Sequence, residues 1–281
     1  MQKRTLGKTG HLLSVVGFGG IVVMNETPDD AARYVAQAIA RGINYFDVAP
    51  TYGNAEERLG PALEPYRNDV FLACKTTQRD QAGSAEELQR SLERLHTDHL
   101  DLYQFHGVTS MDDVEQIFAP AGAMRTFLDA RDKGLIDHIG FSAHSEEAAL
   151  AMLARFDFDS ILFPINRYAW YQGQFGARIV EKAVEMGIGI LALKTLAQRR
   201  WLPDEARTWA KTWYKPIDTL EEALPAARFT LSRPITAAVA PGHAELAWLL
   251  CDAVEQFTPL TAAEEAEMAQ MGAELTPVFS H

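Results

Sequence analysis

The sequence predicts a closed (β/α)8 barrel with a short N-terminal β-hairpin, and three observations point to this fold. Eight short apolar segments alternate with helical patterns along the 281 residues, as expected for repeated strand–helix units. The apolar segments are continuous runs, which is typical of parallel strands that are buried on both faces. The segment at residues 17–22 has Val22 where the phosphate-binding motif of a doubly wound sheet, G-x-G-x-x-G, requires its last glycine. We expect residues 1–281 to form a single barrel domain, because barrels of roughly 250 residues are often one unit.

The chain begins with the predicted hairpin, which we place within residues 4–13. Gly7 and Gly10 mark the turns of this segment. A short apolar run at residues 14–19 follows directly and is expected to form the first strand of the barrel.

The first helix has clear start and stop signals. Thr27 is expected to cap it and Pro28 to occupy its first position, where the missing N–H of proline costs nothing. Gly42 is expected to end it. The apolar residues that share one helical face, and are therefore expected to be buried, are Ala32, Val35, Ala36 and Ile39.

Seven further strand–helix units follow the same scheme. Their strands are expected at residues 43–48, 70–74, 100–105, 138–141, 160–163, 188–193 and 235–240. Their helices are expected at about residues 55–63, 84–96, 122–133, 145–155, 176–186, 220–231 and 244–257. Ser84, with Glu87 three residues later, is expected to form a capping box at the start of its helix.

Composition and charge exclude several classes of function. The formal net charge is −12, which repels phosphate backbones, so we expect no nucleic-acid partner. Cys74 and Cys251 have no metal-type spacing, and we expect both to be buried thiols of a reducing compartment. The polar N-terminus has no signal segment, and the longest apolar runs, such as residues 187–193, are too short to cross a membrane. A cytoplasmic location is therefore expected.

Four titratable residues are expected to meet at one mouth of the barrel. Asp47, Lys75 and His106 end the second, third and fourth predicted strands, and Tyr52 follows Asp47 closely. In such barrels the chemistry lies at the C-terminal ends of the strands. Each residue alone has a plain structural explanation, as a loop cap, a solvated charge, a loop histidine or a packing residue. Their combination on three consecutive strand ends favours a catalytic site.

The segments that carry these residues resemble a known family. They are Gly-Ile-Asn-Tyr-Phe-Asp-Val-Ala-Pro-Thr-Tyr-Gly at residues 42–53, Phe-Leu-Ala-Cys-Lys at 71–75 and Leu-Asp-Leu-Tyr-Gln-Phe-His at 100–106. In them the chain is similar to the aldo-keto reductase superfamily, and the resemblance covers nearly the whole chain. It implies a nicotinamide-dependent reductase that converts an aldehyde or ketone to an alcohol, with a catalytic tetrad at Asp47, Tyr52, Lys75 and His106.

The reaction defines the role of each tetrad residue. Hydride attack on a carbonyl builds negative charge on its oxygen, so a proton donor is needed there. Tyr52 is expected to be this general acid, with its pKa lowered by the nearby Lys75. Asp47 is expected to hold Lys75 charged and in place. His106 is expected to hydrogen-bond and orient the substrate oxygen.

The resemblance also implies cofactor-binding residues after the later strands. The family's Ser-Asn pair, which binds the carboxamide of nicotinamide, falls on Ser142 and Ala143, so only the serine matches. The segment Phe-Pro-Ile-Asn at residues 163–166 is typical of a subgroup, and Asn166 is assigned there. The family's aromatic residue that stacks on nicotinamide falls on Leu193.

The remaining cofactor residues lie in loops around the mouth of the barrel. The loop after the seventh strand folds over the pyrophosphate in the family, and its basic residues are either phosphate ligands or solvated charges. The helix that opens after the eighth strand can bind phosphate through backbone N–H groups. The residues assigned to the cofactor in these loops and after the first strand are Lys194, Arg199, Arg200, Gly242, His243, Gly19 and Gly20.

The identity of the nicotinamide cofactor is ambiguous from sequence. Family resemblance favours NADP(H). The segment after the eighth strand instead favours NAD(H), because residues 240–260 contain no Arg or Lys and Glu245 would repel a 2′-phosphate. Relatives with the Phe-Pro-x-Asn pattern can carry a C-terminal cysteine cluster, which this chain lacks, so we expect neither an iron–sulfur cluster nor another metal.

The substrate is expected to be a small carbonyl compound. Trp170, Tyr171 and Trp201 follow strand ends, and aromatic surfaces there would suit a sugar-like ring. The alternative is that these rings only pack the loops. Two other functions stay open: a nicotinamide-binding regulatory subunit with little turnover, and an isomerase or lyase that recycles a bound cofactor. The oligomeric state is not indicated by the sequence.

Overall fold

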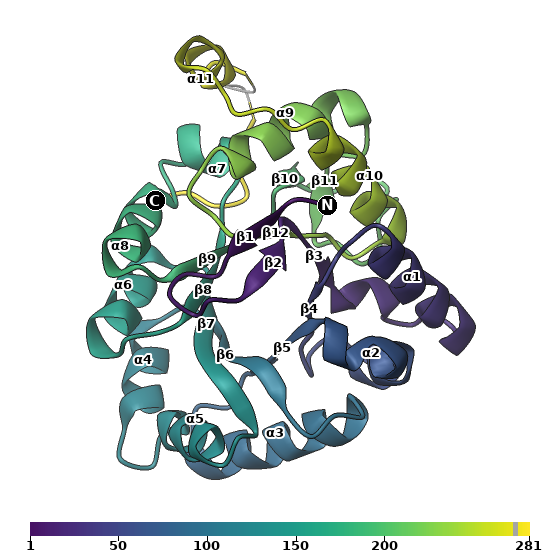
Figure 1. The fold of residues 1–281 in the computed structure, drawn as a ribbon. Helices are drawn as coiled ribbons and strands as arrows, with labels where there is room; N and C mark the ends of the chain where they lie inside the picture. Colours follow the sequence, from purple (N-terminus) through teal and green to yellow (C-terminus); the bar gives the residue numbers. More distant parts are fainter. Residues whose placement is uncertain (272–274) are drawn as a thin grey trace.

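The computed structural model describes residues 1–271 and 275–281 and contains a closed barrel of eight parallel strands. Around the barrel the order is β12-β3-β4-β5-β6-β7-β8-β9, so each strand pairs with its sequence neighbours and the ring closes between β12 and β3 (Figure 1). This confirms the predicted fold. The barrel strands are β3 (Val16–Gly19), β4 (Tyr45–Asp47), β5 (Phe71–Thr76), β6 (Leu100–Val108), β7 (Ile136–Ala143), β8 (Ser160–Pro164), β9 (Gly189–Leu193) and β12 (Ala237–Val239).

Helices surround the ring of strands (Figure 1). Those that follow the eight strands are α1 (Pro28–Ala40), α2 (Ala55–Leu63), α3 (Gln81–Arg94), α5 (Ala123–Asp132), α6 (Glu146–Arg155), α8 (Ala177–Met186), α9 (Leu220–Leu231) and α10 (Ala244–Glu255). The additional short helices, which were not predicted, are η1 (Gly20–Val23), η2 (Glu64–Asp69), α4 (Met111–Phe118), α7 (Arg167–Tyr171) and α11 (Ala262–Met268). Among the described helices, none is long and apolar enough to cross a membrane.

The predicted N-terminal hairpin is present and closes one end of the barrel. Its strands, β1 (Lys3–Thr5) and β2 (Leu12–Ser14), pair antiparallel and lie across the ring of strands in Figure 1. Leu6 and Leu13 are buried in one cluster with apolar side chains from six barrel strands. The chemistry therefore has to take place at the opposite end, where the strands have their C-termini.

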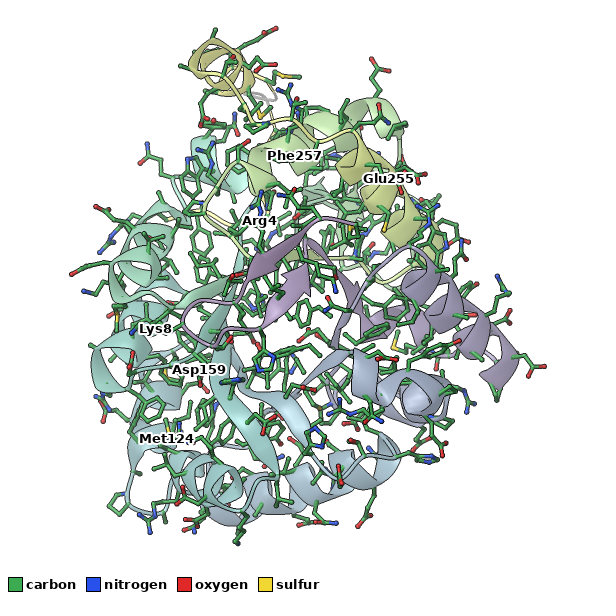
Figure 2. All side chains as sticks on the ribbon, viewed as in Figure 1. Arg4, Lys8, Met124, Asp159, Glu255 and Phe257 are labelled. Carbon is green, nitrogen blue, oxygen red and sulfur yellow. The ribbon has the colours of Figure 1, made fainter. Side chains whose placement is uncertain are left out.

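Arg4 fastens this hairpin to the barrel. Its guanidinium donates hydrogen bonds to the carbonyl oxygens of Ile235 and Leu231, each at 2.9 Å. It also lies 5.7 Å from the centre of the Phe257 ring, and the two side chains are labelled near each other in Figure 2. These contacts tie the start of the chain to α9 and to the segment after α10.

Helix α1 begins as predicted, and its buried face overlaps the predicted face only in part. Thr27 caps it by accepting a hydrogen bond from the Asp30 N–H at 3.1 Å, and Pro28 is its first residue. The buried residues are Ala31, Val35 and Ala38, whereas the predicted Ala32 and Ala36 are exposed. Alanines on neighbouring stripes of the helix satisfy the same 3.6-residue spacing, so periodicity alone selected the wrong stripe.

The predicted capping box at Ser84 and Glu87 is wrong. Helix α3 begins at Gln81, and its cap is Asp80, which accepts a hydrogen bond from the Gly83 N–H at 2.8 Å. Both predicted residues are buried inside the helix. The Ser84 hydroxyl bonds the hydroxyl of Thr126 at 2.8 Å, and Glu87 accepts a hydrogen bond from Thr76 at 2.6 Å.

Candidate active site

The four predicted catalytic residues line one cavity at the C-terminal end of the barrel. Asp47 is the last residue of β4, Lys75 lies near the end of β5, His106 lies near the end of β6, and Tyr52 lies between β4 and α2. The cavity has a volume of about 190 Å³. The parallel strands bring their C-termini to one rim, which is why residues far apart in sequence meet here.

A buried ion pair forms the base of the cavity. The Lys75 ammonium contacts the Asp47 carboxylate and also donates to the Val48 carbonyl oxygen at 3.1 Å. The Gln104 amide donates to the other Asp47 oxygen at 2.9 Å. Burial is the largest single influence and lowers the pKa of Lys75, but the charge and hydrogen bond of Asp47, together with Tyr52 and Cys74, raise it above its ordinary value. Lys75 is therefore held as a fixed cation.

Tyr52 lies above this pair. The Lys75 nitrogen is 5.7 Å from the centre of the Tyr52 ring, and the ring meets that of His106 edge to face at 5.8 Å. Burial raises the pKa of Tyr52, Lys75 acts in the opposite direction, and Asp47 adds to the rise. The expected net lowering of the Tyr52 pKa is thus not found, because burial and the carboxylate together exceed the effect of the ammonium.

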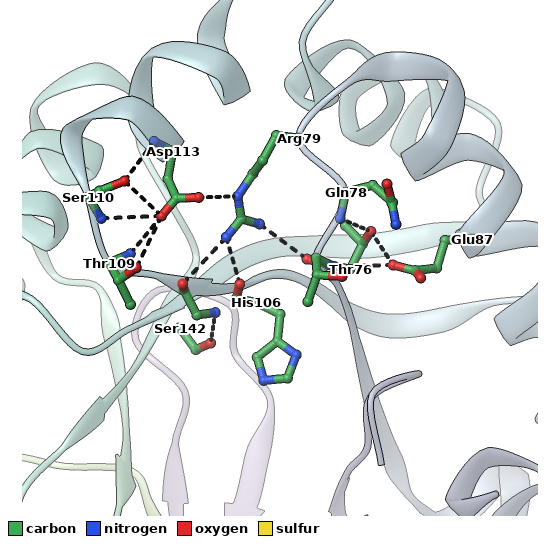
Figure 3. A network of polar contacts seen from close by, with 11 residues as sticks. Thr76, Gln78, Arg79, Glu87, His106, Thr109, Ser110, Asp113 and Ser142 are labelled. Carbon is green, nitrogen blue, oxygen red and sulfur yellow. Dashed lines mark hydrogen bonds and ion pairs between the residues drawn. The ribbon is translucent and has the colours of Figure 1, made fainter. Parts of the chain in front are cut away.

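His106 is neutral at physiological pH. Burial, followed by the charge of Lys75, lowers its pKa to about 3. Its Nδ1 lies 3.4 Å from the Thr51 hydroxyl. Arg79 donates to the main-chain oxygen of His106 at 2.8 Å and forms an ion pair with Asp113, as Figure 3 shows. A neutral imidazole of fixed position can donate a hydrogen bond to a substrate oxygen.

Only some of the predicted cofactor residues reach the cavity. Those that line it are Gly19, Ser142, Lys194 and Gly242. Ser142 also accepts a hydrogen bond from the Gly107 N–H at 2.8 Å, which links the ends of β7 and β6 (Figure 3).

Other predicted cofactor residues serve the protein itself. Asn166 is buried and caps α7 by accepting from the Ala169 N–H at 2.9 Å. Gly20 opens η1, where a side chain would collide with Val48. His243 accepts a hydrogen bond from the backbone N–H of Lys211 at 3.0 Å.

A two-stranded ribbon follows β9 and holds the predicted arginines away from the cavity. Its strands are β10 (Ala197–Arg200) and β11 (Tyr214–Pro216), and we call the intervening residues 201–213 the strap. Arg199 donates to both carboxylate oxygens of Glu205, at 2.6 and 2.9 Å, and Arg200 is exposed. The predicted phosphate fork is therefore replaced by an internal ion pair that folds the strap.

The strap reaches across the mouth and contributes residues that the sequence did not single out. Lys211 donates to the Val22 oxygen at 2.8 Å and to the Glu26 carboxylate at 2.6 Å. Lys211, Thr212 and Trp213 line the cavity, as does Tyr214 of β11. These contacts are long-range, so no local sequence pattern identifies them.

The predicted substrate aromatics lie outside the cavity lining. Trp170 and Tyr171 of α7 pack edge to face on Phe229 of α9, at 5.8 and 5.4 Å. Trp201 donates to the Thr212 oxygen at 3.0 Å and so ties the two ends of the strap together. Their positions agree with the alternative interpretation, in which these rings pack the loops and do not bind substrate.

The comparison with protein families fits this geometry. The sequence model described as the aldo/keto reductase family matches residues 15–211, which covers most of the barrel and the strap up to Lys211. The chain belongs to the aldo-keto reductase family. Members of this family are oxidoreductases that use NAD(P)H and act on small carbonyl compounds.

Individual relatives in the aldo-keto reductase family share about a third of their residues with this chain over the parts that align. The chain is 34% identical over 157 residues to "Uncharacterized oxidoreductase YqkF" of Bacillus subtilis, which is 51% of this chain and 49% of that protein. It is 36% identical over 138 residues to "L-galactose dehydrogenase" of Arabidopsis thaliana, 43% of each chain. The matched parts thus span about half, or less, of these relatives. The holo form of an aldo-keto reductase from Bacillus halodurans superposes with a TM-score of 0.76 at 25% identity, over 99% of this chain and 98% of that one.

The residues around the cavity fit a nicotinamide dinucleotide on one side. Helix α10 is capped by His243 without a side-chain hydrogen bond, so the N–H groups of its first turn are available to a phosphate oxygen. Gly242 lines the cavity next to this helix end, and Lys211 is a basic residue in the same lining. Leu193 offers an apolar surface where the family stacks an aromatic ring on nicotinamide.

Proposed function

We propose that this aldo-keto reductase reduces an aldehyde or ketone to an alcohol with NAD(P)H, and that Tyr52 is the general acid. The observation that supports this most is the arrangement of Tyr52, Lys75, Asp47 and His106 around one cavity. When bound, the reduced nicotinamide supplies the hydride that attacks the carbonyl carbon.

The charge states of the four residues define what each of them does in the reaction. The neutral His106 imidazole donates a hydrogen bond to the carbonyl oxygen and orients it. As charge builds on that oxygen, the Tyr52 hydroxyl transfers its proton to it, which completes the alcohol and leaves a tyrosinate. The ammonium of Lys75 stabilises the tyrosinate, and Asp47 keeps Lys75 charged.

We propose NADP(H) as the preferred cofactor, with NAD(H) as the alternative. Lys211 supports a phosphorylated ligand, because it is a basic residue that lines the cavity together with Gly242. Two facts act against a 2′-phosphate. Lys211 is already paired with Glu26, and Glu245 lies in the first turn of α10. Trp170, Tyr171 and Trp201 are not among the residues that line the cavity, so their positions do not support a sugar-like substrate.

The test compares wild type with Tyr52→Phe. Binding of NADPH and NADH is measured separately by fluorescence titration, and turnover is then measured on a panel of aldehydes and ketones. We expect both proteins to bind the same cofactor, and kcat of the variant to fall by about 10²- to 10⁴-fold, the usual contribution of a general acid. Tyr103→Phe is the matched control, because Tyr103 is buried against Phe127 and is not among the residues that line the cavity.

Two other outcomes would redirect the proposal. Cofactor binding by wild type without reduction of any carbonyl compound would favour the regulatory subunit. A tightly held nicotinamide with turnover but no net change in its absorbance would favour an isomerase or lyase. Absence of binding for both cofactors would refute the oxidoreductase proposal.

A further inference from the structure

Lys194 occupies an unusual position directly after β9. Its backbone has φ of +67°, in the left-handed region that a lysine rarely adopts. Its side chain lines the same cavity as Tyr52 and His106. Sparsely populated backbone conformations persist where the surrounding structure enforces them, and they cluster at functional sites.

The ammonium of Lys194 has no anionic partner within the described part of the chain. No carboxylate lies within ion-pair distance of its nitrogen, and its side chain makes no hydrogen bond there. Instead it lies 4.7 Å from the centre of the Tyr214 ring and 5.2 Å from that of Trp213. By contrast, Lys75 and Lys211, which line the same cavity, are each paired with a carboxylate.

The surroundings leave this charge uncompensated. Asp47 is the one acidic residue among those that line the cavity, and it is already bound by Lys75 and Gln104. Burial lowers the pKa of Lys194 to about 8, so most molecules carry the charge at pH 7. The cavity is thus locally positive in a chain of formal net charge −12, which concentrates anions at this one place.

A second polar group without a partner lies beside this charge. The Nε2 atom of His144 is buried and has no hydrogen-bond partner among the described residues, although His144 lines the cavity. Its ring stacks on Phe279 at 5.3 Å, which fixes its orientation. Burial and then Lys194 lower the pKa of His144 to about 4, so the ring is neutral and can donate one hydrogen bond.

We propose that Lys194 binds a carboxylate of the substrate, so that the preferred substrate is an oxo acid, that is, an aldehyde or ketone that also carries a carboxylate. His144 supplies a second hydrogen bond to the same group. The inference rests on the proposed reductase function and specifies its substrate class. Trp213, whose side chain is 47% exposed at the rim, offers an apolar surface to the carbon skeleton between the two ends.

The position of Lys194 favours substrate over cofactor phosphate as the source of the anion. The ammonium of Lys194 lies over the rings of Trp213 and Tyr214, in the cavity that His106 and His144 also line, and its charge helps to lower the pKa of both histidines. Next to α10, the backbone of Lys211 contacts Gly242 and His243, and its ammonium is bound by the Val22 oxygen and the Glu26 carboxylate. Two basic residues thus serve two separate parts of one cavity.

The test uses a matched pair of substrates, 4-carboxybenzaldehyde and its methyl ester. Wild type should prefer the acid in kcat/KM by roughly 10- to 100-fold, the range expected for a hydrogen bond to a charged group. Lys194→Met should lose this preference, because its kcat/KM should fall more for the acid than for the ester. Lys194→Asn is a second neutral variant whose side chain suits the left-handed backbone. Lys182→Met, on the exposed face of α8, removes the same charge elsewhere and should keep the preference.

Further measurements distinguish the ways in which the inference can fail. NADPH affinity, measured by fluorescence, should not change in Lys194→Met; a weaker affinity with equal losses on both substrates would assign Lys194 to the cofactor and overturn the inference. Equal use of acid and ester by wild type would also overturn it, while leaving the reductase function intact. If wild type reduces neither compound, calorimetry with benzoate decides. Binding to wild type but not to Lys194→Met supports the anion site, and no binding to either rejects it.

Discussion

Replacing Asp47 by asparagine should destabilise the protein by leaving Lys75 as a buried charge without a counter-ion. The side chains are 1% and 2% exposed for Lys75 and Asp47, so water cannot screen the loss. Breaking a buried pair by removing one partner typically costs about 3–5 kcal/mol. For a chain of this size that corresponds to a fall in Tm of roughly 6–10 °C, at about 2 °C per kcal/mol.

The stability lost in Asp47→Asn should depend on pH in a defined direction. In wild type the pKa of Lys75 is raised, so the stabilisation is present at neutral pH and is lost only as pH rises through that raised pKa. In Asp47→Asn, the main opposition to burial is removed, and the pKa of Lys75 should fall below its ordinary value. The unfolded state then binds more protons than the folded state, and stability of the variant should rise with pH. The Tm difference from wild type should therefore narrow between pH 7 and pH 10.

The assay is differential scanning calorimetry of wild type, Asp47→Asn and the double variant Asp47→Asn/Lys75→Met. The double variant removes both charges and should recover most of the lost Tm, because a buried pair can be replaced by apolar groups at little cost. Equal Tm values for wild type and the single variant would refute the reasoning. So would a double variant that is no more stable than the single one.

Three further predictions concern the N-terminal hairpin that closes and plugs one end of the barrel, the position of His106, and the anion site at Lys194. Leu6→Ala should lower the free energy of unfolding by about 2–5 kcal/mol in urea titrations, as for other fully buried leucines; a loss below 1 kcal/mol would argue against a packed plug. Arg79→Met should lower kcat without weakening cofactor binding in fluorescence titrations, because it releases the main chain at His106; unchanged kcat would contradict this. Benzoate affinity, measured calorimetrically, should fall about fivefold from pH 8 to pH 9 as Lys194 loses its proton, because His106 and His144 are neutral throughout; a flat profile would exclude Lys194.

The barrel and the tetrad could be predicted because both depend on local pattern and on one geometric rule. Continuous apolar runs locate buried parallel strands, and closure of the ring brings every strand end to one rim. Asp47, Lys75 and His106 had to meet once their strands were placed. The pKa of Tyr52 could not be predicted in the same way, because it depends on how burial, Lys75 and Asp47 balance in space.

The aromatic and basic loop residues were less predictable for a physical reason. Trp170 and Tyr171 follow a strand end, but α7 turns them onto Phe229, where they gain apolar contacts. Arg199 finds Glu205 six residues away and is neutralised. The side chains that reach the cavity instead, such as Lys211 and Trp213, are placed there by the pairing of β10 with β11. Pairing of this kind leaves no periodic signal in the sequence.

Closure of one barrel end by the hairpin has a consequence for how ligands enter and leave the protein. With Leu6 and Leu13 filling that end, reactants and products share the opening beneath the strap. A ligand that lies deeper must enter before one that lies nearer the rim, and it must leave after it. The architecture therefore imposes ordered binding and release. The ligand that leaves last and the ligand that binds first compete for the same unliganded protein.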